Sequence, residues 1–133
     1  RSMLRGRVLL VDDEPSVLAV LRETLVTWGL TVEACASVEA AERVFAAAPE
    51  FFDLLVTDHV MPQMTGIELA ERLRARLPTL RWLLYTGFAD EASIARARSL
   101  GALAVLHKPV EAIKGRTAIE SALQTADDQL DGD

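Results

Sequence analysis

The sequence predicts an α/β fold in which helices cover both faces of a parallel β-sheet. Two observations lead to this prediction. Five short hydrophobic runs rich in Val and Leu recur along the 133 residues, as expected of strands that are buried on both faces. Amphipathic helical patterns alternate with these runs, and such alternation is typical of a parallel sheet between two layers of helices.

The patterns place five strands and five helices. Pro15 suits the first turn of the first helix, and Gly29 suits its exit. Ser37 opens the second helical pattern, whereas Gly115 interrupts the last one and obscures its start. We expect strands near residues 7–11, 31–35, 53–57, 81–85 and 103–107, and helices near residues 15–28, 37–48, 65–77, 90–100 and 112–127.

The length and composition fit a single globular domain. We expect this domain to span residues 1–127, and an acidic tail to follow at residues 128–133. Half of the residues are hydrophobic and 26% are charged, as in ordinary soluble proteins. No apolar run approaches the roughly 18 residues of a membrane span, and no signal peptide precedes the first strand. We therefore expect a cytoplasmic domain without membrane contact.

The charge and the cysteine content exclude further classes. A net charge of −6 argues against direct nucleic-acid binding, which normally needs clustered Lys and Arg. The one cysteine, Cys35, cannot form an internal disulfide, and its place on a strand favours a core side chain. Four arginines alternate with apolar residues and are expected to form a solvated face: Arg72, Arg74, Arg76 and Arg81.

Four of the five hydrophobic runs end in polar residues, whereas the run TVEAC does not. Because the carboxyl ends of parallel strands meet at one edge of a sheet, we expect these polar side chains to converge in one crevice. A carboxylate there can accept a phosphoryl group, a magnesium ion can bring the two anions together, and an ammonium can pair with a phosphoryl oxygen. The set comprises Asp12, Asp13, Asp58, Thr86 and Lys108.

Each of these residues has a simpler explanation when it is taken alone. Asp12 and Asp13 could merely cap the helix that begins near Pro15. Thr86 could be an ordinary β-branched residue at a strand end. The phosphoryl site is favoured because all five residues occur together and in strand order.

The segments VLLVDDEPS, DLLVTDHVMPQMTG, TGFAD and HKP together resemble the receiver domain of bacterial two-component response regulators, from about Val8 to Lys108. The resemblance and the rules for right-handed crossovers imply a flavodoxin-like, doubly wound sheet with strand order 2-1-3-4-5. The resemblance also implies a phosphorelay receiver. Such a domain catalyses only its own phosphorylation and dephosphorylation, and phosphorylation changes its partner-binding surface.

The resemblance assigns a role to each site residue. Asp58 would be the phosphoacceptor and would bind Mg²⁺ together with Asp13 and the backbone carbonyl of Val60. Asp12 would act mainly through water. Lys108 would pair with a phosphoryl oxygen or, in its absence, with Asp58. Thr86 would turn its hydroxyl toward the phosphoryl group, and the bond from Lys108 to Pro109 would be cis.

The resemblance also implies the partners. The phosphoryl donor would be a histidine kinase or a histidine phosphotransfer domain. A homodimer through the face formed by residues 90–100, 103–107 and 112–127 is a further expectation. The parent protein is open: we favour the receiver of a hybrid sensor histidine kinase over a free-standing domain. The stimulus, the output and the oligomeric state are not encoded in these motifs.

Two histidines and one departure from the family pattern lie near the site residues. Successive side chains on a strand point to opposite faces, so we expect His107 to point away from Lys108, and we expect His59 to be a bystander as well. Three residues before the lysine, the family usually carries Tyr or Phe, whose movement accompanies that of the threonine. This chain has Val105 there, and Phe88 is the nearest aromatic residue in sequence to the Thr86 loop.

Three other classes of protein compete with the receiver. A module of the same fold that has lost phosphorylation would normally lack one of the five site residues, and none is missing. A haloacid-dehalogenase-like phosphatase would carry a second Asp two residues after the first, where this chain has Val60. A nucleotide-binding Rossmann domain is weaker still, because the first strand continues into DDEPS rather than a Gly-rich turn.

Overall fold

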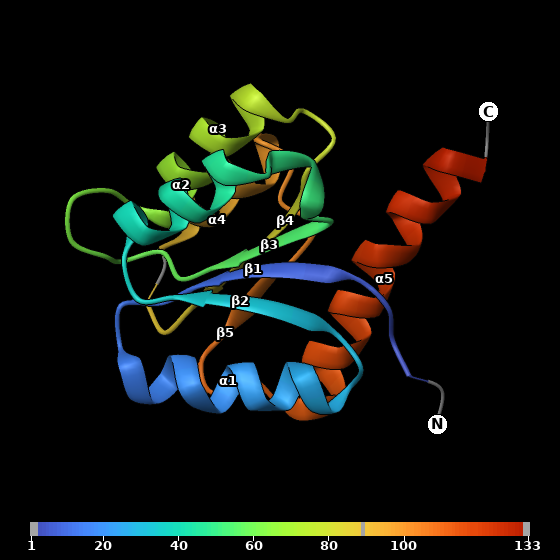
Figure 1. The fold of residues 1–133 in the computed structure, drawn as a ribbon. Helices are drawn as coiled ribbons and strands as arrows, with labels where there is room; N and C mark the ends of the chain where they lie inside the picture. The colour runs from blue at the N-terminus through green and yellow to red at the C-terminus, as the bar shows by residue number, and fades with distance from the viewer. Residues whose placement is uncertain (1–2, 89, 132–133) are drawn as a thin grey trace.

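The computed structural model describes residues 3–88 and 90–131, and for residues 125–131 it describes the backbone only. Its centre is a five-stranded parallel sheet with the order β2-β1-β3-β4-β5, which is the order predicted from the sequence (Figure 1). The central strands are buried on both faces, which explains their continuous apolar runs. The strands are β1 (Arg7–Val11), β2 (Thr31–Cys35), β3 (Leu54–Thr57), β4 (Arg81–Thr86) and β5 (Val105–His107).

Helices cover the two faces of the sheet in separate layers (Figure 1). The helices α1 (Pro15–Thr27) and α5 (Ala112–Asp131) lie on one face. The helices α2 (Val38–Ala47), α3 (Gly66–Arg76) and α4 (Glu91–Ser99) lie on the other, and a short 3₁₀ turn, η1 (Pro49–Phe51), precedes β3. Among the described residues, none of the helices has the length and apolar character that a membrane span needs.

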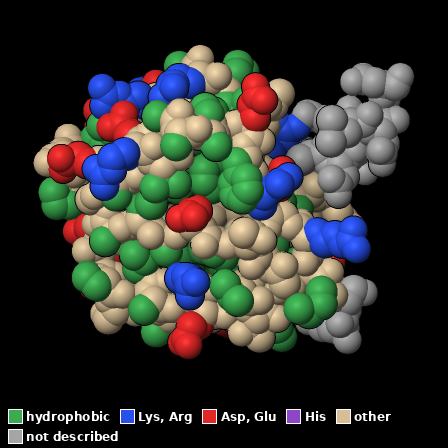
Figure 2. All heavy atoms as spheres, viewed as in Figure 1, with side chains coloured by type: hydrophobic (Ala, Val, Ile, Leu, Met, Phe, Trp, Pro, Cys, Tyr) green, Lys and Arg blue, Asp and Glu red, His purple; other side chains and the backbone are tan. Residues whose placement is uncertain are grey.

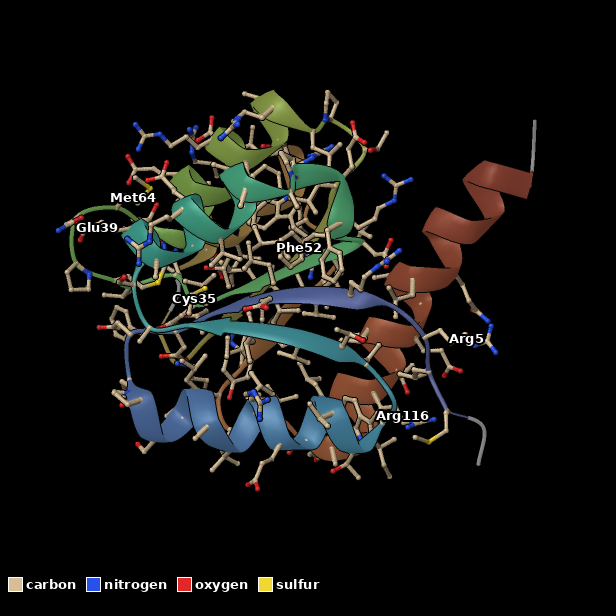
Figure 3. The ribbon with its side chains drawn as sticks, viewed as in Figure 1. Arg5, Cys35, Glu39, Phe52, Met64 and Arg116 are labelled. Carbon is tan, nitrogen blue, oxygen red and sulfur yellow. The ribbon has the colours of Figure 1, made fainter. Side chains whose placement is uncertain are left out.

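Each layer has its own hydrophobic core, because strand side chains alternate between the two faces. Leu9 and Trp82 belong to the core beneath α2, α3 and α4, and Leu10 and Leu83 belong to the core beneath α1 and α5. Phe52 extends this first core between the sheet and α2 (Figure 3), where its ring stacks 6.2 Å from that of Phe45.

In the other layer, the residue that follows α1 contacts α5. Arg116 of α5 lies over the ring of Trp28, the residue that follows α1, at 5.8 Å from the ring centre (Figure 3).

Cys35 is buried at the end of β2, as predicted, and burial raises the pKa of its thiol to about 11. The thiol is therefore neutral at physiological pH.

Local capping explains where several helices begin. The Oγ of Ser37 accepts a hydrogen bond from the backbone N–H of Ala40, so Ser37 is the N-cap of α2. Thr65 and Glu68 form a reciprocal capping box at the start of α3. Asp90 caps α4 by accepting a 2.7 Å hydrogen bond from the N–H of Ser93.

The structure differs from the predicted elements in a few places. The turn η1 was not expected, and β5 begins at residue 105 rather than 103. The helix α5 continues to Asp131, four residues beyond the expected end at 127, into the segment interpreted as an acidic tail. Residues 132 and 133 of that tail lie outside the described residues.

The expected solvated arginine face is only partly correct. Arg72 forms an exposed ion pair with Glu42 at 3.4 Å. Arg74 instead donates a 2.6 Å hydrogen bond to the backbone carbonyl of Leu100 at the end of α4. On the face shown in Figure 2, basic and acidic side chains are interspersed rather than segregated.

Candidate functional site

The predicted site residues lie together at the carboxyl ends of the parallel strands. Asp12 follows β1, Asp58 follows β3, Thr86 ends β4 and Lys108 follows β5. The sheet pairing continues just beyond the strands, because the N–H of Asp58 donates to the carbonyl of Val11 and the N–H of Lys108 donates to the carbonyl of Thr86, both at 2.9 Å. The backbone of the sheet therefore sets the spacing of these side chains.

Three carboxylates form an acidic cluster at this edge. Asp12, Asp13 and Asp58 each offer an oxygen, and these oxygens all lie within 4.8 Å of one another. Asp12 is fully buried and Asp58 is 5% exposed, whereas Asp13 is partly exposed. Burying like charges is costly without a cation. Hard oxygen donors in this number and proximity are the ligands that Mg²⁺ prefers, so the cluster fits such an ion.

Backbone groups orient two of these carboxylates. The Oδ1 of Asp12 accepts a 2.9 Å hydrogen bond from the N–H of Glu14, and the Oδ1 of Asp58 accepts a 2.8 Å hydrogen bond from the N–H of His59. The Oδ2 atom of each carboxylate faces Lys108. One oxygen of each carboxylate is thus held by the backbone, and the other is turned to the shared crevice.

Lys108 joins the ends of β1 and β3. Its Nζ lies 2.8 Å from Oδ2 of Asp12 and 3.3 Å from Oδ2 of Asp58, and its side chain is 16% exposed. The contact with Asp58 had been predicted for the unphosphorylated domain, but the shorter contact is with Asp12. The Lys108–Pro109 peptide bond is cis, as the resemblance implied.

The pKa values of the two partners reflect this crowding. Burial raises the pKa of Asp58 above its ordinary value, and the negative charge of Asp12 adds to the rise, although Lys108 opposes it. Burial alone would lower the pKa of Lys108, but its hydrogen bond and charge interactions with Asp12 and Asp58 outweigh burial and raise it. Lys108 is therefore protonated at neutral pH.

The hydroxyl of Thr86 is bonded within its own loop. Thr86 is buried, its Oγ1 donates to the carbonyl of Phe88 at 3.0 Å, and the same oxygen accepts from the N–H of Phe88 at 3.1 Å. Phe88 itself is 79% exposed. A rotation of the Thr86 hydroxyl toward Asp58 would break both bonds and release the backbone of this loop.

The loop between β3 and α3 depends on a glycine. The N–H of Gly66 donates a 2.8 Å hydrogen bond to the carbonyl of His59, and a Cβ added at Gly66 would overlap the carbonyl oxygen of Asp58. A residue with a side chain therefore does not fit at position 66 without moving Asp58. Val60, whose backbone carbonyl is expected to bind the metal beside Asp13 and Asp58, lies in this loop and is 60% exposed.

The neighbouring positions show different environments. His107 is exposed at the end of β5. His59 is partly buried, and its Nδ1 has no hydrogen-bond partner in the described part of the chain. Val105 is partly buried and packs against the core beneath α4.

One contact of the site was missed in the sequence. The ring of Tyr85 lies beneath the lysine, with its centre 5.0 Å from Nζ of Lys108. Tyr85 precedes Thr86 on β4, so alternation indicated only that it faces the opposite layer. No sequence pattern connects an aromatic residue on β4 with a lysine that follows β5.

Residues 8–120 match the family model of the response regulator receiver domain. The regulator NtrC of Salmonella typhimurium is 33% identical over 128 residues, which cover 96% of this chain and 27% of NtrC. The response regulator FleR of Pseudomonas aeruginosa is 35% identical over 129 residues, which cover 97% of this chain and 26% of FleR. The chain thus spans about a quarter of the length of these curated relatives.

Solved structures share the fold. A CheY-like receiver domain from Methanospirillum hungatei superposes with a TM-score of 0.86 at 27% identity, covering 95% of this chain and 99% of that chain. A receiver domain from Clostridium thermocellum gives a TM-score of 0.85 at 27% identity, covering 90% of this chain and 95% of that chain.

Proposed function

This chain belongs to the response regulator receiver domain family, and we propose that its Asp58 accepts a phosphoryl group from a phosphohistidine of a partner kinase or phosphotransfer protein. The observation that carries the assignment is the position of Asp58 within reach of two carboxylates and the Lys108 ammonium. Asp12 cannot take the role as easily, because it is fully buried and its two oxygens are already bonded to Glu14 and Lys108.

In the proposed step, an Oδ atom of Asp58 attacks the phosphorus atom of the donor. A phosphorus–oxygen bond forms while the phosphorus–nitrogen bond to the histidine breaks, and the imidazole nitrogen leaves with the electron pair and takes up a proton. The N–H of His59 holds the Oδ1 atom of Asp58, which leaves the Oδ2 atom as the attacking oxygen. The ammonium of Lys108 then leaves its carboxylate oxygen and pairs with a phosphoryl oxygen.

Receiver domains generally bind Mg²⁺ at an acidic pocket, and we assign the ligands here to Asp13, Asp58 and the backbone carbonyl of Val60. Asp12 would contribute through water, because its Oδ1 and Oδ2 atoms are occupied by Glu14 and Lys108. Bound Mg²⁺ would offset the negative charge that the donor and Asp58 bring together. The domain would catalyse only its own phosphorylation and dephosphorylation.

Signalling would begin at Thr86. Its hydroxyl would leave the two Phe88 backbone groups and bond the phosphoryl group, so the loop before α4 would change shape. Val105 offers neither an aromatic ring nor a phenolic hydroxyl on β5. We therefore propose that the change is concentrated in the loops and is smaller along residues 90–108.

The parent protein and its partners are part of the proposal. NtrC is a DNA-binding transcriptional regulator, and this chain covers 27% of it. We propose that this acidic domain makes no direct contact with DNA itself, and that a regulator of this type is as suitable a parent as a hybrid kinase. We also propose that the domain is cytoplasmic and that it dimerises through the surface of α4, β5 and α5.

The test is phosphorylation by a small donor. The domain is incubated with acetyl phosphate or phosphoramidate and Mg²⁺, and intact mass spectrometry is expected to show one added phosphoryl group. Asp58→Asn should abolish the addition, and removal of Mg²⁺ by a chelator should suppress it. Asp53→Asn is the matched control, because Asp53 precedes the same strand at its opposite end. Equal labelling of Asp58→Asn and the unmodified domain would refute the assignment.

A further inference from the structure

The aromatic ring of Tyr85 is a third partner of the Lys108 ammonium. The ring centre lies 5.0 Å from Nζ, which also lies 2.8 Å from Asp12 and 3.3 Å from Asp58. A cation at this distance from a ring is attracted by the negative face of the π system. We propose that Tyr85 is a positioning residue that holds Lys108 in place for phosphoryl transfer, which rests on the proposed function of Asp58.

The sheet brings the two residues together. Tyr85 of β4 is the register partner of Leu106 on β5, and Lys108 follows two residues later. The lysine stem then turns back over the backbone of Gly87, where an added Cβ would lie 3.7 Å from both Cβ and Cδ of Lys108. These distances are those of ordinary van der Waals contact, so the stem packs against Gly87 while the pairing of β4 with β5 brings the ammonium to the ring.

A contact between a cation and an aromatic ring suits a lysine that must bind a phosphoryl group. An ion pair with another carboxylate would neutralise the ammonium and would have to be broken before Lys108 could serve a phosphoryl group. A neutral ring attracts the cation without accepting one of its three N–H groups, which stay free to donate to Asp12, Asp58 and a phosphoryl oxygen. Burial raises the pKa of Tyr85, although the charge of Lys108 opposes the rise, so the phenol is neutral at pH 7 and the contact is one of cation and ring.

Close packing alone does not hold the ring in position. Tyr85 is only partly buried, and it lines a cavity of about 480 Å³ between α1 and α5 together with Trp28 and Leu106. The ring therefore has open space on one side and the lysine on another. Tyr85 also packs against the core beneath α1 and α5, so the tests below compare a variant that loses the ring with variants that keep it.

The first test is the rate of phosphorylation by phosphoramidate at saturating Mg²⁺. Tyr85→Leu should lower the rate by about 3- to 10-fold, whereas Tyr85→Phe should stay within about twofold of the unmodified domain. Phenylalanine analogues with one, two and three ring fluorines at position 85 should lower the rate step by step, because fluorine weakens the negative face of the ring with little change in shape.

The second test needs no phosphoryl group. The chain has only two lysines, Lys108 and Lys114, so their ε-methylene NMR signals can be told apart by mutation. The Lys108 signal should be displaced upfield by the ring in the unmodified domain and in Tyr85→Phe, and it should return toward the Lys114 value in Tyr85→Leu.

These results separate the two proposals. If Tyr85→Leu is phosphorylated as fast as the unmodified domain, Tyr85 does not position Lys108, even though Asp58 is phosphorylated. The same conclusion follows if Tyr85→Leu is slow but all fluorinated variants are phosphorylated at equal rates. If the unmodified domain takes no phosphoryl group, the proposed function fails. The ε-methylene signal of Lys108 then tests the contact with Tyr85 by itself, and a signal without upfield displacement would show that the contact does not form.

Discussion

Lys108 and Asp12 are 96 residues apart in the chain, yet their side chains form a 2.8 Å hydrogen-bonded ion pair at the edge of the sheet. Asp12 is fully buried, and only 16% of the lysine side chain is exposed. Breaking a buried pair by removing one member leaves a charge without compensation, which costs more than the pair contributes when intact.

Removing this lysine should therefore destabilise the metal-free domain. We expect Lys108→Met to lower the free energy of unfolding by about 1 to 3 kcal/mol, because Asp12 loses its cationic partner. Urea denaturation without metal measures the change. Lys114→Met, at an exposed position on α5, is the control and should have little effect. Equal stability of the two variants would show that the ion pair contributes nothing to the fold.

Gly66 should be sensitive to the smallest substitution. In Gly66→Ala the added Cβ would overlap the carbonyl oxygen of Asp58, so we expect a loss of about 1 to 3 kcal/mol in unfolding free energy and slower phosphorylation. Gly115→Ala is the comparison, since its Cβ would meet only side-chain atoms of Val110 and Trp28, at 3.2 and 3.7 Å. A Gly66→Ala variant as stable and as active as the unmodified domain contradicts this account of the loop.

Arg74 should anchor the end of α4. Its guanidinium and the indole N–H of Trp82 both donate to the carbonyl of Leu100, at 2.6 and 3.3 Å. We expect Arg74→Gln to cost about 1 to 2 kcal/mol, because it removes a charged donor from a helix C-terminus, whereas Arg98→Gln on the exposed face of α4 should cost little. Thermal unfolding compares the two variants, and equal melting temperatures would show that Arg74 does not anchor the end of α4.

The capping box of α3 predicts a specific pH dependence. The backbone N–H of Thr65 donates to Glu68, and this bond, with a smaller contribution from the Thr65 hydroxyl, holds the pKa of Glu68 below its ordinary value of 4.5. A carboxyl group whose pKa is lower in the folded than in the unfolded state stabilises the fold at pH values above its unfolded-state pKa. This stabilisation is lost as the pH falls through the folded-state pKa.

The comparison that isolates this contribution is Glu68→Gln, which keeps an acceptor and removes the charge. The stability difference between the unmodified domain and Glu68→Gln should be constant near neutral pH and should shrink below about pH 4.5. Urea titrations across this range measure it, with Glu120→Gln on α5 as a control for the loss of one exposed charge. A difference that is the same at every pH contradicts the assignment.

The sequence predicted the framework of the site because its signals are local. Asp12, Asp58, Thr86 and Lys108 each end a recognisable hydrophobic run, and parallel strands bring such ends together. The strand bounds of β1 and β2 agree with the predicted ranges, and Pro15 marks the start of α1 as expected.

What the sequence did not reveal depends on side-chain conformation or on pairing between distant elements. Lys108 had carboxylates on two strands within reach, and only the structure shows that Asp12 is the closer. Arg74 resembled its neighbours on a solvated helix, but the close approach of Gly101 brings the end of α4 within its reach. The last helix lacks a residue that stops it near 127, so its end was placed too early.

The most direct measurement is the chemical identification of the phosphorylated residue. Asp12, Asp13 and Asp58 have oxygens within 4.8 Å of one another, so intact mass alone does not distinguish them. Reduction with borohydride converts an aspartyl phosphate into homoserine, which peptide mass spectrometry locates. After treatment with phosphoramidate and Mg²⁺, we expect homoserine at position 58 and unmodified aspartate at positions 12 and 13. Homoserine at position 12 or 13, with aspartate retained at 58, would contradict the account.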